Sequence, residues 1–269
     1  MYLVLFLYIA AFFSLVLGEF GQFPFGRSDF SVASTDVLVL LNLSAILVWN
    51  VGIKKNLKLP RNFIYIVLFW AVGILSLFLS LDLSGWFYLL RFIIYSSLFY
   101  VTYHLVKSRI LGLDEFLKLV KYISLSLAGL GFLQIIIFPD LEILSAIGYD
   151  PHKYRLFGTF LDPNFLGAFL SFGFALSILE LTLQKPLKIK EFFIQNRLLI
   201  GSAFVLGLAI LLTFSRSAYL MSAAALSIIL LVKNIKLFGI FLAGVLILYF
   251  IFPPFNARIQ GAINIDKSA

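Results

Sequence analysis

The chain contains no cysteine, and only 13% of its 269 residues are charged. The missing cysteines exclude a disulfide framework, a thiolate nucleophile and a cysteine metal site. Soluble domains carry about 25% charged residues, whereas 62% of this chain is hydrophobic. Apolar runs of about 20 residues recur along the sequence, and a soluble protein would have nowhere to bury them. The composition therefore predicts an all-α polytopic membrane protein.

Several enzyme signatures are also missing. There is no Gly-rich nucleotide loop, no pair of histidines at metal-binding spacing and no nucleophile elbow. The acidic residues Asp29, Asp36 and Asp82 are scattered, so they suggest no carboxylate dyad. We therefore expect neither a metal nor a cofactor. The net charge of +8 does not indicate nucleic-acid binding, because basic residues of membrane proteins concentrate in cytoplasmic loops.

The hydropathy pattern predicts about nine membrane-spanning helices. Residues 1–18 are apolar from the start and lack a basic n-region, which indicates a retained helix rather than a signal peptide. The other expected spans are 36–53, 62–81, 86–106, a fifth that ends near Phe138, and 163–182, 198–213, 217–232 and 237–252. We expect one transmembrane domain over 1–269, with the first five helices in 1–154, the motif-bearing helices in 155–252 and the start of an outward loop in 253–269.

Lysine and arginine are distributed unevenly between the two predicted sides. Of the 21 such residues, 14 fall in the connections that follow the second, fourth, sixth and eighth spans. Cytoplasmic loops carry the excess of positive charge. The sequence therefore predicts a multi-pass protein of the bacterial cytoplasmic (inner) membrane with a cytoplasmic N-terminus.

The stretch Arg155–Gly167 is the most punctuated sequence between two apolar runs. Asp162 can cap a helix by accepting backbone N–H groups, and Pro163 suits the first helical position. The N–H groups and the dipole at that helix start favour an anion, and Arg155 can add a cationic fork for phosphate. The alternative explanation is a membrane helix with a good cap and an interfacial arginine.

A second polar break, Thr213–Leu220, again places an arginine, Arg216, beside an expected helix start. Thr213 and Ser215 are both candidate caps for that helix. The two breaks, taken in order, resemble the O-antigen ligase and O-antigen polymerase family. The resemblance is carried by Gly158-Thr159-Phe160, Asp162-Pro163-Asn164 and Thr213-Phe214-Ser215-Arg216-Ser217. It covers roughly residues 155–220, and elsewhere only the hydropathy plan is shared.

The resemblance implies a function in cell-envelope polysaccharide biosynthesis, including that of lipopolysaccharide. Members of the family are membrane glycosyltransferases that move glycan from an undecaprenyl-pyrophosphate donor to a glycan or lipid acceptor at the outer face of the membrane. The resemblance implies that Arg155 and Arg216 hold the donor pyrophosphate without a metal. The supporting residues would be Thr159, Asp162, Asn164, Ser215 and Arg91. Ligase and polymerase share these motifs, and the sequence does not separate them.

One part of the family pattern has no match. Family members carry a histidine, thought to activate the acceptor hydroxyl, in a large outward loop late in the chain. This sequence stops 15 residues after Pro254, about where that loop would begin, so we expect a C-terminally truncated chain. His152 precedes Arg155 by three residues and is a weak catalytic candidate.

Two further alternatives remain open. Arg91 lies six residues into the fourth span, roughly 9 Å deep. An intramembrane charge is a functional candidate, although a long side chain can also snorkel to the interface. The whole protein could instead be a transporter or flippase for a lipid-linked or anionic substrate, because broken helices that point at an anion also serve transport. A non-catalytic membrane subunit is the remaining alternative.

Overall fold

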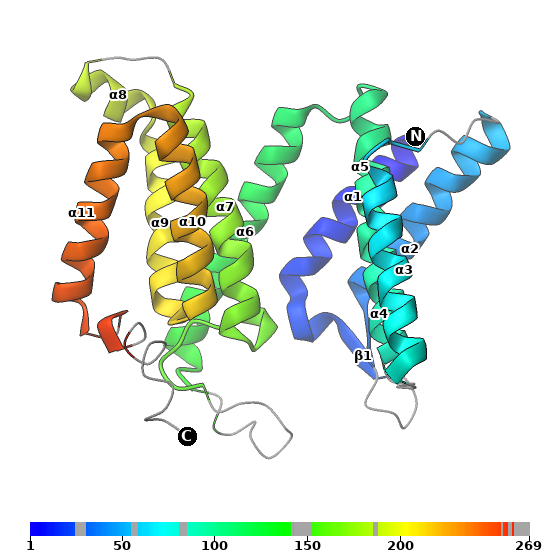
Figure 1. The fold of residues 1–269 in the computed structure, drawn as a ribbon, viewed down its shortest axis with the longest axis horizontal. Coiled ribbons are helices and arrows are strands. Elements are labelled where there is room, and N and C mark those ends of the chain that lie inside the picture. Colours follow the sequence, from blue (N-terminus) through cyan, green and yellow to red (C-terminus); the bar gives the residue numbers. More distant parts are fainter. Residues whose placement is uncertain are drawn as a thin grey trace. The chain divides into compact units, whose positions relative to one another are not determined.

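The computed structural model shows an all-α polytopic membrane protein, as the composition predicts (Figure 1). It describes residues 1–24, 31–54, 59–80, 85–140, 142, 152–184, 188–253, 255–257 and 260. Within this part of the chain, seven helical segments are long and apolar enough to cross a membrane, and two more apolar helices are shorter. Each of the nine expected spans corresponds to one of these segments. Asp29, Asp82 and most of the expected loop 253–269 lie outside the described residues.

The chain divides into two compact units, Met1–Leu119 and Val120–Ala269. Unit 1 contains α1 (Tyr2–Ser14), η1 (Leu15–Gly21), β1 (Gln22–Pro24), β2 (Ser31–Ala33), α2 (Ser34–Leu47), η2 (Val48–Ile53), α3 (Phe63–Ser80), α4 (Gly85–Ser96) and α5 (Leu98–Lys107). Helix α6 (Leu113–Ile137) runs from unit 1 into unit 2. Unit 2 continues with η4 (Gly158–Phe160), α7 (Pro163–Thr182), α8 (Ile189–Gln195), α9 (Arg197–Thr213), α10 (Arg216–Lys233) and α11 (Ile235–Ile251).

Two connections between the expected spans contain regular structure. After the first span, β1 pairs with β2 as a short antiparallel ladder, with Phe23 opposite Val32. Gly18, with φ of 53°, kinks the chain inside η1, before the hairpin begins. The basic connection after the sixth span contains the short helix α8, whose first turn carries Glu191. In both places local hydrogen bonding pairs backbone groups that an irregular loop would leave for water.

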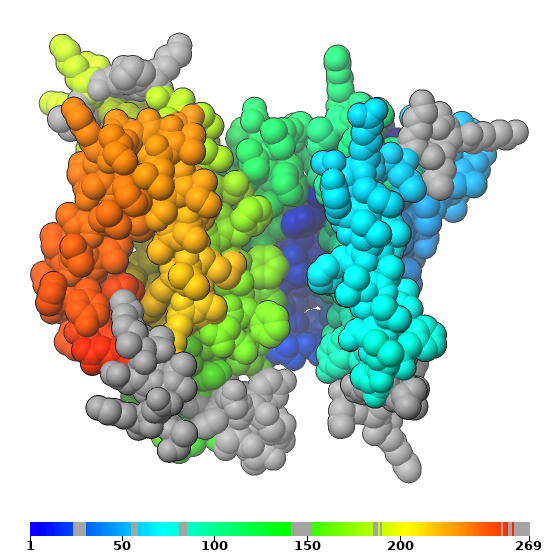
Figure 2. All heavy atoms as spheres, in the orientation of Figure 1, coloured from blue at the N-terminus to red at the C-terminus, as the bar shows by residue number. Residues whose placement is uncertain are grey.

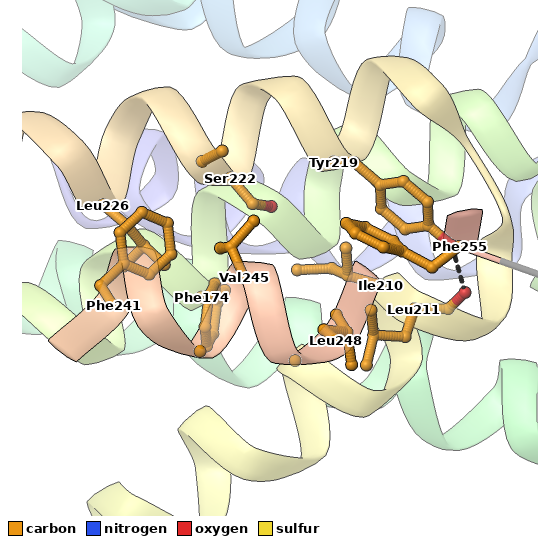
Figure 3. A pocket seen from close by; sticks show the side chains of 13 residues that line it. Phe174, Ile210, Leu211, Tyr219, Ser222, Leu226, Phe241, Val245, Leu248 and Phe255 are labelled. Carbon is orange, nitrogen blue, oxygen red and sulfur yellow. Dashed lines mark hydrogen bonds between the residues drawn. The ribbon is translucent and has the colours of Figure 1, made fainter. Parts of the chain in front are cut away.

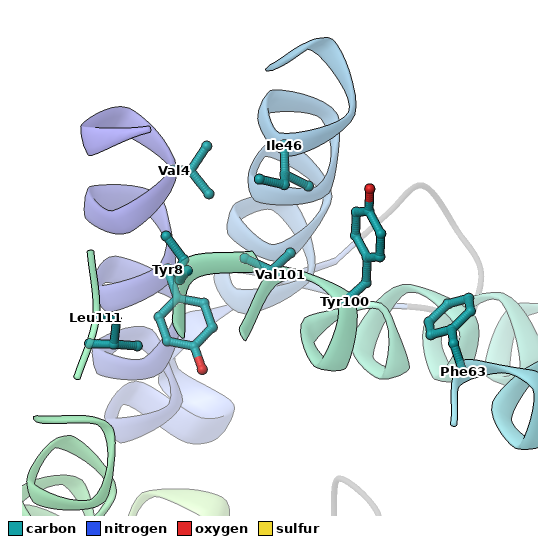
Figure 4. Packing of buried hydrophobic residues seen from close by; sticks show 8 residues of the cluster. Val4, Tyr8, Ile46, Phe63, Tyr100, Val101 and Leu111 are labelled. Atoms are coloured by element: carbon teal, nitrogen blue, oxygen red, sulfur yellow. The ribbon is translucent and has the colours of Figure 1, made fainter. Parts of the chain in front are cut away.

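The core of unit 1 is formed by apolar side chains from α1, α2, α3 and α5 (Figure 4). Two hydrogen bonds pair polar side chains within this core. The Tyr8 hydroxyl lies 2.7 Å from the Thr102 hydroxyl, and the Asn50 amide donates to the Tyr100 hydroxyl at 2.9 Å. Because an unpaired polar group in hydrocarbon costs several kcal/mol, these pairs allow tyrosine and asparagine to lie within membrane helices.

Unit 2 is packed around α7, which lies against both α9 and α10. Figure 1 shows the three helices, and Figure 2 shows the side where α10 meets α7. The close approach of α7 to α10 requires small residues. A Cβ atom on Gly167 would lie 2.6 Å from the Cβ of Ala218, so only glycine fits there. The Ser171 hydroxyl lies 3.1 Å from the Ala218 carbonyl and accepts a hydrogen bond from Ser222. Small residues and short polar side chains are the usual means of holding membrane helices together.

Candidate functional site

The two polar breaks of the sequence meet at one end of unit 2. Helices α7 and α10 begin there and α9 ends there (Figure 1). The backbone N–H of Leu156 donates to the carbonyl of Leu212 at 2.9 Å. The Ser215 hydroxyl donates to the side-chain oxygen of Asn164 at 2.7 Å, across 51 positions of sequence. These hydrogen bonds join the two motifs into one site.

The start of α7 has the cap that the sequence predicts. The Asp162 carboxylate accepts hydrogen bonds from the backbone N–H groups of Asn164 at 2.5 Å and Phe165 at 3.1 Å. Pro163 occupies the first helical position, where no N–H is needed. The structure confirms that Asp162 caps this helix and that Pro163 begins it.

The start of α10 is capped by Ser215, one of the two predicted candidates. Its hydroxyl accepts a hydrogen bond from the backbone N–H of Ala218 at 3.3 Å. Thr213, the other candidate, ends α9 instead, and its hydroxyl donates to the Ile210 carbonyl. Ser215 is only 1% exposed, and its oxygen also lies 2.9 Å from the Ser217 hydroxyl.

Arg155 binds the carboxyl end of α9. Its Nε donates to the Thr213 carbonyl at 2.9 Å and its Nη2 to the Phe214 carbonyl at 3.3 Å. Phe214 has the left-handed conformation of a helix C-cap, with φ of 48°. Carbonyl groups at a helix C-terminus carry partial negative charge, so a cation is stabilised there. Arg155 therefore has a structural partner that the sequence did not reveal, and its half-buried guanidinium is held in one place.

His152 lies beside the same guanidinium. Its Nδ1 is 3.3 Å from Nη1 of Arg155. Arginine can only donate, so this contact requires the Nδ1 lone pair, and a neutral ring then carries its proton on Nε2. In this tautomer His152 offers a hydrogen-bond donor at Nε2. It can accept a proton only at Nδ1, the atom that faces Arg155.

Arg216 is the first residue of α10, and its side chain is exposed. It follows Phe214, whose carbonyl Arg155 binds, by two positions. Both arginines therefore belong to the same end of unit 2. Thr159 lies in the 3-10 turn η4, between Arg155 and the start of α7 in sequence. That the two guanidinium groups share one phosphate remains a prediction.

An apolar cavity of about 360 Å³ lies elsewhere in unit 2, among α7, α9, α10 and α11 (Figure 3). Aromatic and aliphatic side chains, including Phe174, Ile210 and Phe241, form its wall. The Tyr219 hydroxyl donates to the Leu211 carbonyl at 2.7 Å in this wall. Neither Arg155 nor Arg216 lines this cavity, which is suited to hydrocarbon rather than to a charged group.

Arg91 belongs to unit 1, and its contacts there explain its position. Its Nη2 lies 2.8 Å from Oδ2 of Asp36 and donates to the Ser31 carbonyl at 2.6 Å. The same carboxylate oxygen accepts from the backbone N–H of Ala33 at 2.8 Å, which caps α2. The pair ties α4 to the start of α2 and to β2. Arg91 thus has a structural role that neither of the sequence-based alternatives included.

Gln134, near the end of α6, was not singled out from the sequence. Its side-chain amide binds the backbone of the segment that carries Arg155. The only signal in the sequence is a polar residue within an otherwise apolar run, and this signal does not identify the residues that Gln134 binds.

A metal centre was also sought. Among the described residues, no three His, Asp or Glu side chains lie together in a way that could hold a metal ion.

Comparison of the chain with protein-family models, with curated proteins and with solved structures finds no match.

Proposed function

We propose that this protein is a membrane glycan transferase of the O-antigen ligase or polymerase type. It moves or polymerises glycan from an undecaprenyl-pyrophosphate donor onto a glycan or lipid acceptor at the outer face of the bacterial cytoplasmic membrane. The observation that carries the proposal is the contact of Arg155 with the Thr213 and Phe214 carbonyls. That contact joins the two motifs of the resemblance at one end of unit 2, with Arg216 exposed beside it.

The arrangement suits a pyrophosphate leaving group. Negative charge grows on the pyrophosphate as the glycosyl bond breaks, and a preorganised cationic site stabilises that charge in the transition state. Arg216, exposed at the first position of α10, supplies the side chain that binds phosphate. Arg155 supplies a second positive charge whose place is fixed by α9, so little entropy is lost when the donor binds.

The lipid part of the donor requires an apolar surface. The cavity lined by Phe174, Ile210 and Phe241 lies in the same unit, and its apolar lining suits part of a hydrocarbon chain. A single polyprenyl chain could enter it or lie against the flanks of α10 and α11, whose outward side chains are apolar. Burial of each CH₂ group contributes about 0.8 kcal/mol.

Activation of the acceptor hydroxyl requires a general base. His152 contacts Arg155 through Nδ1, so it is suited to orient that guanidinium. Its role as the base stays the weaker prediction made from the sequence. The base is expected outside the described residues or on another part of the assembly.

The test is binding of undecaprenyl pyrophosphate to the detergent-solubilised full chain, with Arg216→Lys as the variant. Lysine keeps the charge but loses the planar fork, so affinity should fall about 10-fold, as expected for the loss of one charge-assisted hydrogen bond. Arg197→Lys is the matched control, because Arg197 is also exposed at the first position of a helix, α9. Equal affinity of wild type and Arg216→Lys would contradict the proposal. Translocation of a fluorescent polyprenyl pyrophosphate in proteoliposomes, with no transfer of glycan, would support the transporter alternative.

A further inference from the structure

Gln134 combines burial with hydrogen bonds to a distant segment. It lies in α6 with 9% of its surface exposed. A glutamine side chain offers two N–H donors and one carbonyl acceptor. Leaving these groups unpaired within a membrane helix would be costly. Their hydrogen-bond partners therefore show which segment of the chain Gln134 holds in place.

Three of the four contacts of this amide go to residues 155–158. Its Oε1 accepts from the backbone N–H of Phe157 at 2.9 Å and of Gly158 at 3.1 Å. Its Nε2 lies 3.4 Å from the Arg155 carbonyl. The fourth contact, at 2.8 Å, is to the Phe138 carbonyl at the end of its own helix. The amide therefore links α6 to the segment that carries Arg155.

That segment needs partners from outside itself. Leu156 and Phe157 are 0% and 1% exposed, yet neither belongs to a helix or strand. Gly158 has φ of 56°, so the backbone turns there and makes no regular ladder. Buried N–H groups must be paired, and Gln134 pairs two of them. One turn earlier on α6, Gly131 leaves room for the Leu156 side chain, because a Cβ atom at Gly131 would collide with it.

We infer that Gln134 is the positioning residue of the Arg155 segment. It acts through the backbone of residues 155–158 and fixes the point from which the Arg155 guanidinium reaches the Thr213 carbonyl. The inference deepens the proposed function and rests on it in one respect, namely that the charge so placed faces a donor pyrophosphate. Gln134 does not itself contact the donor.

The first test needs no ligand. Gln134→Met keeps the size of the side chain and removes its hydrogen bonds. Phenylglyoxal modifies arginine, and mass spectrometry follows the rate at each site in the solubilised full chain. We expect the rate at Arg155 to rise roughly 2- to 10-fold, the factor that corresponds to one hydrogen bond of ordinary net strength. The rates at Arg216, which is already exposed, and at Arg91, which is paired in unit 1, should not change.

The controls separate a local from a global effect. Gln184→Met removes an exposed glutamine whose Nε2 donates to the Glu180 carbonyl, and it should leave the Arg155 rate unchanged. Gln134→Glu keeps an oxygen that accepts from Phe157 and Gly158, so its Arg155 rate should lie between those of wild type and Gln134→Met. If Gln134→Met does not yield folded protein, the Arg155 rate of Gln134→Glu is compared with that of wild type instead. An unchanged Arg155 rate, or an equal rise at Arg91, would overturn the inference.

The second test uses undecaprenyl pyrophosphate as the probe. If wild type binds it, Gln134→Met should bind it more weakly by a factor similar to the change in the Arg155 rate, and unchanged binding would overturn the link to the donor. If wild type does not bind it, the proposed function fails. The phenylglyoxal comparison then still decides whether Gln134 positions Arg155.

Discussion

The Ser215 hydroxyl and the Asn164 side chain form a 2.7 Å hydrogen bond between the starts of α10 and α7. Each residue belongs to a different motif, and Ser215 is also the cap of its own helix. The bond therefore couples the two helix starts, so a substitution that alters one cap should also change the position of the other helix start. This coupling places the exposed Arg216 at a fixed point relative to the start of α7.

The cap of α7 is open to a direct test. Asp162→Ala removes the acceptor for the N–H groups of Asn164 and Phe165. It should lower the free energy of unfolding by about 0.5–2 kcal/mol. Asp162→Asn is the control, because its side-chain carbonyl still accepts and should retain most of the stability. Denaturant titration in micelles measures both, and equal losses for the two variants would show that the charge matters rather than the cap.

The contact between Gly167 and Ala218 predicts a compensating pair of substitutions. Gly167→Ala would place a methyl group 2.6 Å from the Ala218 Cβ and force α7 away from α10. Overpacking of this kind costs about 1–3 kcal/mol. Ala218→Gly in the same chain removes the opposing methyl group and should recover part of the loss.

Gly201→Ala is the matched control for this pair. Gly201 is a helical glycine in α9 with nothing within 4 Å of the position that its Cβ would take. Alanine there should be neutral or stabilising by up to about 1 kcal/mol, because it has the higher helix propensity. Thermal unfolding in one detergent compares all four proteins, and destabilisation by Gly201→Ala equal to that by Gly167→Ala would contradict the packing argument.

The Arg91–Asp36 pair should contribute to the stability of unit 1. The two side chains are 28% and 13% exposed. Arg91→Met removes the charge-assisted hydrogen bond to Asp36, so the free energy of unfolding should fall by about 1.5–3 kcal/mol, the usual contribution of a hydrogen bond to a charged group. Glu142→Gln breaks an ion pair with Lys153 in which both side chains are more than half exposed, and it should have little measurable effect. A similar loss for both variants would argue against a specific role for the Arg91 pair.

Membrane orientation can be tested by labelling, because the chain has no cysteine of its own. The charge distribution predicts that Lys153 faces outward and Lys188 faces the cytoplasm. Both residues are exposed. In intact cells an impermeant thiol reagent should therefore label Lys153→Cys and not Lys188→Cys, and permeabilisation should allow both to react. The reverse pattern would show that the protein has the opposite orientation, and it would exclude a site for Arg155 and Arg216 at the outer face.

Local signals in the sequence were enough to predict the apolar helices and the cap of α7, and they left Thr213 and Ser215 as candidates for the cap of α10. Each apolar run predicted one span, because a membrane admits only helices or closed barrels and helices satisfy their own backbone. Asp162 and Ser215 were recognisable because a cap bonds to N–H groups two or three residues along the chain. The hairpin of β1 and β2 was not predicted, because its strands are three residues long and pair across residues 25–30.

Within the candidate site, the sequence by itself determined which residues could bind an anion and where α7 and α10 begin. Only the tertiary structure decided their partners. Arg155 contacts a carbonyl 58 positions away, and Gln134 binds backbone 23 and 24 positions away. No local pattern encodes these distances. They arise because a buried irregular segment and the buried C-terminus of α9 both need hydrogen-bond partners, and tertiary packing brings those partners within reach.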